Sequence, residues 1–218
     1  MADTIGGGIN EDGSLQNTIV IDEADLGKID IVELPNADVT EVAVNSPVKD
    51  LQLGLSGDID VAVAGARLVD TVITNEAATG KTASFTLASA KVKSLEFTTS
   101  GKAATDFLAG EGRVMKPTIT TAKGGASDSI TFAAATTLKS GDISTGKGAD
   151  SLTFNGRLKG KTTVVSGKGN DVIDVDRQSG KGKLILSDFN KKDTLTVDGL
   201  NITTENLDDA PKWIKFDA

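Results

Sequence analysis

The chain of 218 residues lacks both cysteine and histidine, and it contains no tyrosine and a single tryptophan. Without cysteine, disulfides and thiolate metal sites are excluded. Without histidine, the commonest general base and the commonest ligand of transition metals are missing. Aromatic residues make up only 4% of the chain, whereas 24 residues are glycine. This composition indicates many short strands and turns around a narrow core of small side chains.

Long apolar runs and an excess of basic residues are also absent. No stretch approaches ~18 apolar residues, so we expect no membrane-spanning helix. The N-terminal residues MADTIG provide neither a basic region nor an apolar segment, and we therefore expect no Sec-type signal peptide. With 31 acidic and 23 basic residues, the formal net charge is -8. Nucleic acid is disfavoured as a partner, because phosphate binding needs a basic surface and the sequence shows none.

The sequence does contain a repeat of about 22 residues. In each copy polar and apolar residues alternate, as in a strand with one buried face. The period is steady, since the first apolar residues of successive copies are 21 to 23 residues apart. These marker residues are Ile21, Val42, Val63, Phe85, Leu108, Ile130, Leu152, Ile173 and Leu195.

A second apolar strand lies between successive copies of the first, and a Gly-Lys turn usually follows it. One repeat is too short to bury its own apolar face, so neighbouring repeats must stack and share a core. With two clear strands and room for a third short one per repeat, the sequence predicts an all-β fold. The expected architecture is a right-handed parallel β-helix, or β-solenoid, of eight to nine rungs. A β-sandwich is the alternative, but its loops would not keep one period from end to end.

We expect one domain with an N-terminal arm or cap over residues 1–18, the solenoid over 19–198 and a C-terminal cap over 199–218. The open end of a solenoid exposes a sheet edge and a bare core, which must be covered. Trp213, Ile214 and Phe216 are apolar residues in the last segment of the chain. They are predicted to plug this end.

The segment 167–173, with the sequence GKGNDVI, resembles the glycine- and aspartate-rich nonapeptide of the RTX proteins, and 146–152 and 124–130 are further copies. The resemblance implies a calcium-filled parallel β-roll on a secreted protein, and it makes Asp150 and Asp171 candidate calcium ligands. Here, however, the motif occurs once per repeat and contains a lysine. Calcium takes six to eight oxygen ligands, and the lysine would repel it.

The alternative to calcium is a ladder of interleaved lysine and aspartate side chains. Stacked rungs lie about 4.8 Å apart, so bare carboxylates in a column would repel each other. Exposed Lys–Asp pairs contribute only ~0–1 kcal/mol each, but they neutralise the column without metal. We favour this ladder and predict no cofactor. Its members recur at the repeat period: Asp106, Asp128, Asp150, Asp171 and Asp193 with Lys81, Lys102, Lys123, Lys147 and Lys168.

Enzymatic activity is not expected. Polysaccharide lyases and hydrolases also fold as parallel β-helices, and a resemblance to them would imply paired carboxylates in a cleft, with arginine, histidine or aromatic side chains around them. The repeat has no long insertion that would build such a cleft. The outward Ser and Thr positions of the first strand resemble the hydroxyl grid of ice-binding proteins, but Phe107 and Ala109 interrupt that grid.

Two functional hypotheses of different classes remain. The regular solenoid resembles the surface proteins of bacteriophage virions, such as capsid decoration or cement proteins, fibres and spikes. That resemblance implies a non-enzymatic structural protein that contacts other virion or surface-layer proteins and forms a homo-oligomer such as a trimer; from charge and hydropathy we expect neither nucleic-acid binding nor membrane insertion. Phe107 and Phe189 are then expected to be exposed interface residues. The alternative is a secreted, RTX-like bacterial surface or adhesive protein that needs calcium to fold.

Overall fold

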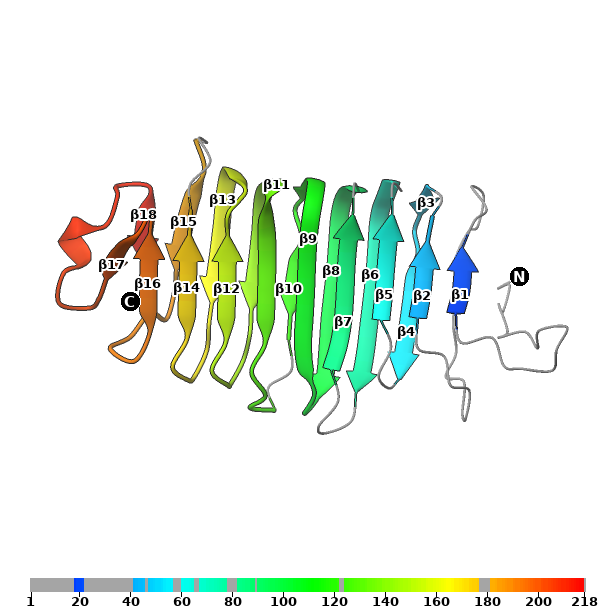
Figure 1. The fold of residues 1–218 in the computed structure, drawn as a ribbon, viewed down its shortest axis with the longest axis horizontal. Coiled ribbons are helices and arrows are strands. Elements are labelled where there is room, and N and C mark those ends of the chain that lie inside the picture. The colour runs from blue at the N-terminus through cyan, green and yellow to red at the C-terminus, as the bar shows by residue number, and fades with distance from the viewer. Residues whose placement is uncertain are drawn as a thin grey trace, which may run out of the picture.

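The computed structural model describes residues 18–21, 41–45, 47–56, 60–64, 67–77, 82–88, 90–121, 124–176 and 181–217. The chain winds into an elongated parallel β-solenoid, whose turns stack along one axis from β1 to the C-terminal cap (Figure 1). It makes about 6 turns of ~22 residues. This confirms the predicted fold class, with somewhat fewer turns than the eight or nine predicted. The predicted arm lies almost entirely outside the described residues.

About six turns, over residues 41–165, present a strand to each of three faces, and the first face continues beyond them at both ends. Strands of successive turns pair in parallel. The first face contains β1 (Thr18–Ile21), β2 (Glu41–Val44), β5 (Asp60–Ala64), β7 (Thr82–Ala88), the start of β9 (Ala104–Met115), the start of β11 (Ser129–Ser144), β12 (Ser151–Phe154), β14 (Val172–Val175) and β16 (Thr194–Val197).

The second face is formed by short strand segments. They correspond to the additional short strand that the sequence allows in each repeat. They are β3 (Val48–Lys49), the starts of β6 (Arg67–Ala77), β8 (Ala90–Gly101) and β13 (Arg157–Val165), the end of β9 and the middle of β11. The third face consists of β4 (Gln52–Ser56), the ends of β6, β8, β11 and β13, and β10 (Thr118–Thr120), β15 (Lys183–Leu186) and β18 (Ile214–Phe216).

Alternate residues of every strand point inward and form columns of apolar side chains. Along the first face, Phe85 stacks on Phe107 with ring centroids 5.2 Å apart, and Phe132 stacks on Phe154 at 5.6 Å. All four rings are at most 1% exposed. Because each inward side chain contacts the equivalent side chain of the next turn, the turns share one continuous core.

The register of this core differs from the predicted column at three markers. Phe107, not Leu108, pairs with both Phe85 and Ile130. Likewise Val61 replaces Val63, because Val61 is the partner of both Val42 and Phe85, and Ile19, not Ile21, is the register partner of Val42. Leu108 points outward and is only partly buried. Apolar residues stand at neighbouring or alternate positions here, so the sequence pattern does not show which of them point into the core.

The corner between the second and third faces is a single residue in the left-handed region. Asp70, Ser94, Lys116 and Ser140 have φ of 52°, 57°, 51° and 54°, and Gly160 follows at 73°. None of these residues is β-branched, and aspartate and glycine adopt this conformation most readily. The repetition of one sharp bend places the three faces at the same angle in every turn.

The C-terminal end is covered by a small cap. After β16, the strand β17 (Leu200–Ile202) turns back antiparallel to it, and a short 3-10 helix (Leu207–Asp209) leads to β18. Ile214 in β18 pairs with Leu184 and is 4% exposed. Trp213 and Phe216 are partly buried against the same core, where the sequence predicts the plug.

No helix in the described part of the chain is long and apolar enough to cross a membrane.

Candidate functional site

The corner between the third and first faces contains the residues that the sequence singles out. Its loops begin at a buried hydroxyl residue and end at a buried aspartate, as from Thr145 to Asp150 and from Ser166 to Asp171. Asp150 is 1% and Asp171 0% exposed. We call the stacked, buried residues Asp128, Asp150, Asp171 and Asp193 the aspartate column.

Each carboxylate of the aspartate column binds the backbone of the preceding turn. The N–H groups of Asp128, Asp150 and Asp171 donate to Oδ1 of the next aspartate along the column, at 2.9, 3.1 and 3.2 Å. At the N-terminal end, the N–H of Thr105 donates to Asp128 Oδ1 at 2.8 Å. The carbonyl oxygens of the same corner residues accept strand bonds from the following turn. The column therefore joins five successive turns by side-chain to backbone hydrogen bonds.

A second buried column of hydroxyl groups lies beside the aspartates. The hydroxyl of Thr121 contacts Asp128 Oδ2 and also lies 2.8 Å from the carbonyl oxygen of Thr145. The hydroxyl of Thr145 in turn donates to the carbonyl oxygen of Ser166 at 2.7 Å. A hydroxyl has a single proton. If Thr121 donates to the carbonyl, its contact with Asp128 is satisfied only when the carboxyl group carries a proton.

Burial favours the protonated form of three carboxyl groups in the column, those of Asp128, Asp150 and Asp193. Burial raises the pKa of Asp150 to about 6, and the like charges of Asp128 and Asp171 add to this, although the Asp128 N–H opposes it. Burial also raises the pKa of Asp128 and of Asp193. Oδ2 of Asp150 and Oδ2 of Asp171 are buried without a hydrogen-bond partner among the described residues. An ionised oxygen in such a place is costly, so Asp128, Asp150 and Asp193 bind protons more tightly than exposed carboxylates do.

Asp150 and Asp171 do not fit the calcium site that the RTX resemblance implies. Oδ1 of each carboxylate already accepts a backbone N–H, whereas calcium takes six to eight oxygen ligands. The described residues hold no group of three or more acidic side chains that could bind a metal. The glycines of the motif have another role: a Cβ on Gly169 would lie 1.5 Å from the carbonyl oxygen of Gly148. Close stacking of the turns therefore requires glycine here without any metal.

The predicted ladder of interleaved lysines and aspartates is also wrong in its geometry. Lys102, Lys147 and Lys168 are exposed, and the backbones of Lys147 and Lys168 form a parallel β-bridge that stacks the two lysines on each other's turns. Within the described part of the chain, no ion pair joins these lysines to the aspartate column. The glycine turn projects its lysine outward, while the aspartate turns inward to bind the backbone. Lys81 and Lys123 lie outside the described residues.

Asp106 does not belong to the column. It is exposed on β9 and shares its position with Ser84 and Ser129 on the outer side of the first face. The buried Thr105, one residue earlier, occupies the equivalent place in the column. The same one-residue shift puts Phe107 and Ala109 inside the core, so neither interrupts the outward hydroxyl positions; Asp106 and Leu108 stand there instead.

The two phenylalanines expected at an interface are not free to form one. Phe107 is 0% exposed and stacks within the core. Phe189 is partly buried and contacts the ring of Phe216 in the cap, with centroids 5.4 Å apart. Both rings therefore stabilise the fold of the chain itself.

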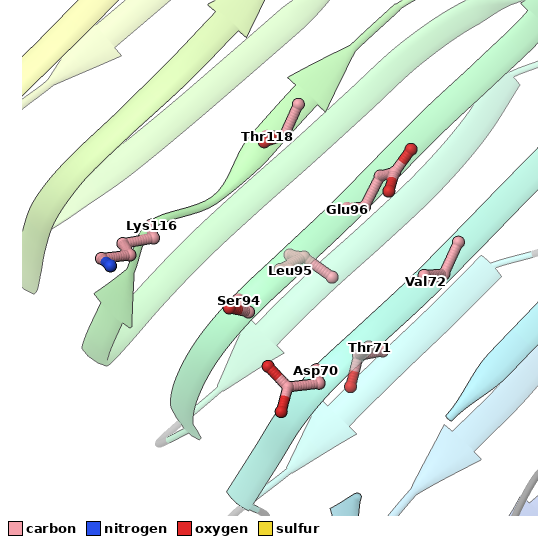
Figure 2. Close-up of a pocket in the computed structure, with 8 residues that line it drawn as sticks. All are labelled: Asp70, Thr71, Val72, Ser94, Leu95, Glu96, Lys116 and Thr118. Atoms are coloured by element: carbon pink, nitrogen blue, oxygen red, sulfur yellow. The ribbon is translucent and has the colours of Figure 1, made fainter. Parts of the chain in front are cut away.

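A shallow pocket of about 290 Å³ lies at the corner between the second and third faces. Figure 2 shows that its side chains come from neighbouring turns and include Asp70, Glu96 and Lys116. All three are exposed. A general acid is usually a desolvated carboxyl group, and this pocket offers none.

Sequence reasoning missed the hydroxyl column and Asp188. Oδ1 and Oδ2 of Asp188 accept the N–H groups of Ser166 and Gly167 at 2.9 and 2.6 Å. A signal exists for the hydroxyls, because Thr145 and Ser166 each precede an aspartate of the column by five residues. Asp188 follows the same columns, since it occupies the hydroxyl position one turn after Ser166.

Comparison with known protein families, with curated proteins and with solved structures gives no match to the chain.

Proposed function

We propose that the chain is a non-enzymatic structural protein of a particle surface, of the kind that bacteriophage virions carry as decoration proteins, fibres or spikes. Its role is to present a rigid rod that contacts other virion proteins and further copies of the chain. The single observation that carries the proposal is the aspartate column, because it links successive turns by buried hydrogen bonds rather than forming an accessible site.

The energetic consequence of the column supports a rigid part. Four aspartates accept N–H groups of the preceding turns at 2.8 to 3.2 Å. A buried hydrogen bond contributes about 1 kcal/mol, and one to a charged group about 1.5–3 kcal/mol. These bonds lie beside the ladder bonds of the strands, so a turn cannot shift without losing both sets.

The even spacing of the turns also supports a building role. The first-face strands from β5 to β16 follow one another in a single parallel register, with one irregularity at β11. Large exposed apolar side chains in the described residues are few: Val165, Val172 and Leu200. A protein of this kind binds its neighbours through extended polar surfaces, not through a pocket.

The proposal is tested on the phage or cell that encodes the chain. Virions are purified by density gradient, and their proteins are identified by mass spectrometry before and after washing with high salt. We expect the chain in the virion fraction in a fixed ratio to the major capsid protein. Its absence from purified virions, together with its presence in the culture supernatant as free protein, would contradict the proposal.

The oligomeric state is tested separately on the purified chain. Light scattering after size exclusion is expected to give a homo-oligomer, such as a trimer. A strictly monomeric protein at high concentration would count against a fibre or spike, although a decoration protein could still bind as a monomer.

A further inference from the structure

The second face carries a dense row of basic side chains that the sequence does not reveal. Two outward columns run along it, and stacked strands place their members opposite each other. Arg67, Lys91, Arg113 and Arg157 form the first column with Thr137, and Lys49, Lys93, Lys139 and Lys159 form the second with Val69 and Met115. We call these eight basic residues the basic stripe. The expectation that the chain has no basic surface is wrong.

The basic stripe is largely without counter-charges of its own. Lys49 is paired with Asp50 at 3.6 Å, and the other seven residues form no ion pair with any residue that the structure describes. Asp50 and Asp70 at the corner and Glu111 before β9 turns onto this face flank it, and none of the three stands in the two columns.

Like charges stand directly opposite each other in the stripe, as Lys91 does between Arg67 and Arg113, and Lys139 beside Lys159. Such pairs destabilise a sheet by a few tenths of a kcal/mol each. The chain has more acidic than basic residues, with a net charge of -8. These basic residues nevertheless stand opposite each other and not opposite acidic ones. An anionic partner that lies along the stripe would remove this repulsion.

The stripe has the dimensions of one extended chain. Six turns at about 4.8 Å spacing make it about 24 Å long, and two residues along a strand separate its columns by about 7 Å. A groove of about 470 Å³ is lined by members of both columns, among them Arg67, Lys91, Lys93, Arg113 and Met115. The repeated sugar units of a polysaccharide have a length similar to the spacing of the turns.

The chemistry of the face disfavours nucleic acid. Single-stranded nucleic acids are bound by aromatic side chains on which bases stack. All seven phenylalanines and the tryptophan are in the core or the cap, and the chain has no tyrosine. Duplex recognition uses an element that enters a groove, whereas this face consists of short, flat strands.

We propose that the basic stripe binds an extended acidic polysaccharide, with sulfate or uronic carboxylate groups on the arginines and lysines and the apolar groups of Val69 and Met115 against the sugar rings. This inference goes beyond the proposed structural role. Its failure would leave that role standing, because virion composition tests the role independently.

The experiment measures binding of the full chain to dextran sulfate and to polygalacturonate by calorimetry, with neutral dextran as the uncharged control. We expect both polyanions to bind and neutral dextran not to bind. Because binding releases counterions, raising NaCl from 50 to 200 mM is expected to weaken it by about tenfold or more. Poly(dT) and duplex DNA serve as competing polyanions of another class.

Two triple variants with the same change of net charge locate the site. Lys91→Gln, Arg113→Gln and Lys139→Gln remove charge from the stripe, and Lys102→Gln, Lys192→Gln and Lys212→Gln remove it from exposed positions elsewhere. We expect the stripe variant to lose about tenfold or more in affinity and the control to stay within about threefold. Circular dichroism checks that both retain the wild-type fold.

Several outcomes would overturn the proposal. These are no binding to either polysaccharide, equal losses in the two variants, or tighter binding of poly(dT) or duplex DNA than of both polysaccharides. Light scattering in 50 mM NaCl provides the last such outcome. If the wild-type chain self-associates and the stripe variant does not, the partner of the stripe is a second copy of the chain.

Discussion

Replacing Asp150 by asparagine tests the physical description of the aspartate column. The amide oxygen of asparagine can still accept the N–H of Asp128, which donates to Asp150 Oδ1 at 2.9 Å. The substitution removes the ability to ionise and places an amide NH2 group where Oδ2 lies. Its effect on stability should therefore depend on pH in a way that a lost hydrogen bond would not.

The sign follows from the two pKa values of Asp150. In the folded chain its pKa is raised from 3.8 to about 6, so the folded state holds the proton more tightly than the unfolded state. The free energy of unfolding is thus highest below the unfolded pKa, falls between about pH 4 and 6, and stays lower above that. Two pKa units at about 1.4 kcal/mol each set an upper limit of about 3 kcal/mol for this loss. Burial raises the pKa of Asp128 and Asp193 in the same direction.

The assay is urea unfolding at pH 4 and pH 8. We expect the wild-type chain to lose stability between the two, and Asp150→Asn to lose about 2–3 kcal/mol less. With a urea dependence of about 2–3 kcal/mol per molar, the midpoint of the variant shifts by about 1 M relative to wild type. The amide Nδ2 lacks a partner, which costs about 1 kcal/mol at both pH values, so the difference between the two pH values is the decisive quantity.

Asp106→Asn is the matched control, because it removes the same charge at an exposed position beside the column. We expect it to alter the pH dependence by less than about 0.5 kcal/mol. A wild-type chain that becomes more stable from pH 4 to pH 8, or an Asp150→Asn variant that follows the wild-type profile, would refute the reasoning.

Three further results are expected. Thr121→Val leaves buried polar atoms without partners and should destabilise the chain by about 1–3 kcal/mol in urea; an effect no larger than that of Thr120→Val, at the partly exposed last residue of β10, would contradict this. Phe132→Ala opens a cavity in the stacked core and should cost about 3–5 kcal/mol, against less than about 1 kcal/mol for Leu108→Ala at its partly exposed position. Adding EGTA to calcium-loaded protein should change Tm by less than about 2 °C, whereas a tightly bound structural ion would shift it by roughly 5 °C or more.

The fold could be predicted from the sequence because stacking enforces one period. Each turn must place its apolar residues over those of the turn below, so apolar residues recur at one repeat length from Val42 to Leu195. It was harder to predict which residues of each strand point inward. At Phe107-Leu108-Ala109 apolar residues are consecutive, and alternation does not say which of them points inward. That single ambiguity moved Asp106 into the predicted column and Phe107 out of the core.

The candidate site was predicted in part. The period identified Asp128, Asp150, Asp171 and Asp193 as one column, but not that they turn inward. Exposed and buried aspartates look alike in a sequence; only the backbone N–H groups within reach decide between them. The basic stripe is harder still: Arg67, Lys91 and Arg113 recur at a similar spacing, but they stand on strands too short to show an alternating pattern.

The central claim is that the corner turns are held by their own hydrogen bonds. Amide hydrogen exchange of the peptides that cover 145–150 and 166–171, measured in EGTA, tests it most directly. The N–H groups of Asp150 and Asp171, which donate to the next aspartate of the column, should exchange as slowly as those of the buried strands β12 and β14. Rapid exchange at these corners in EGTA, made slow by added calcium, would contradict the account.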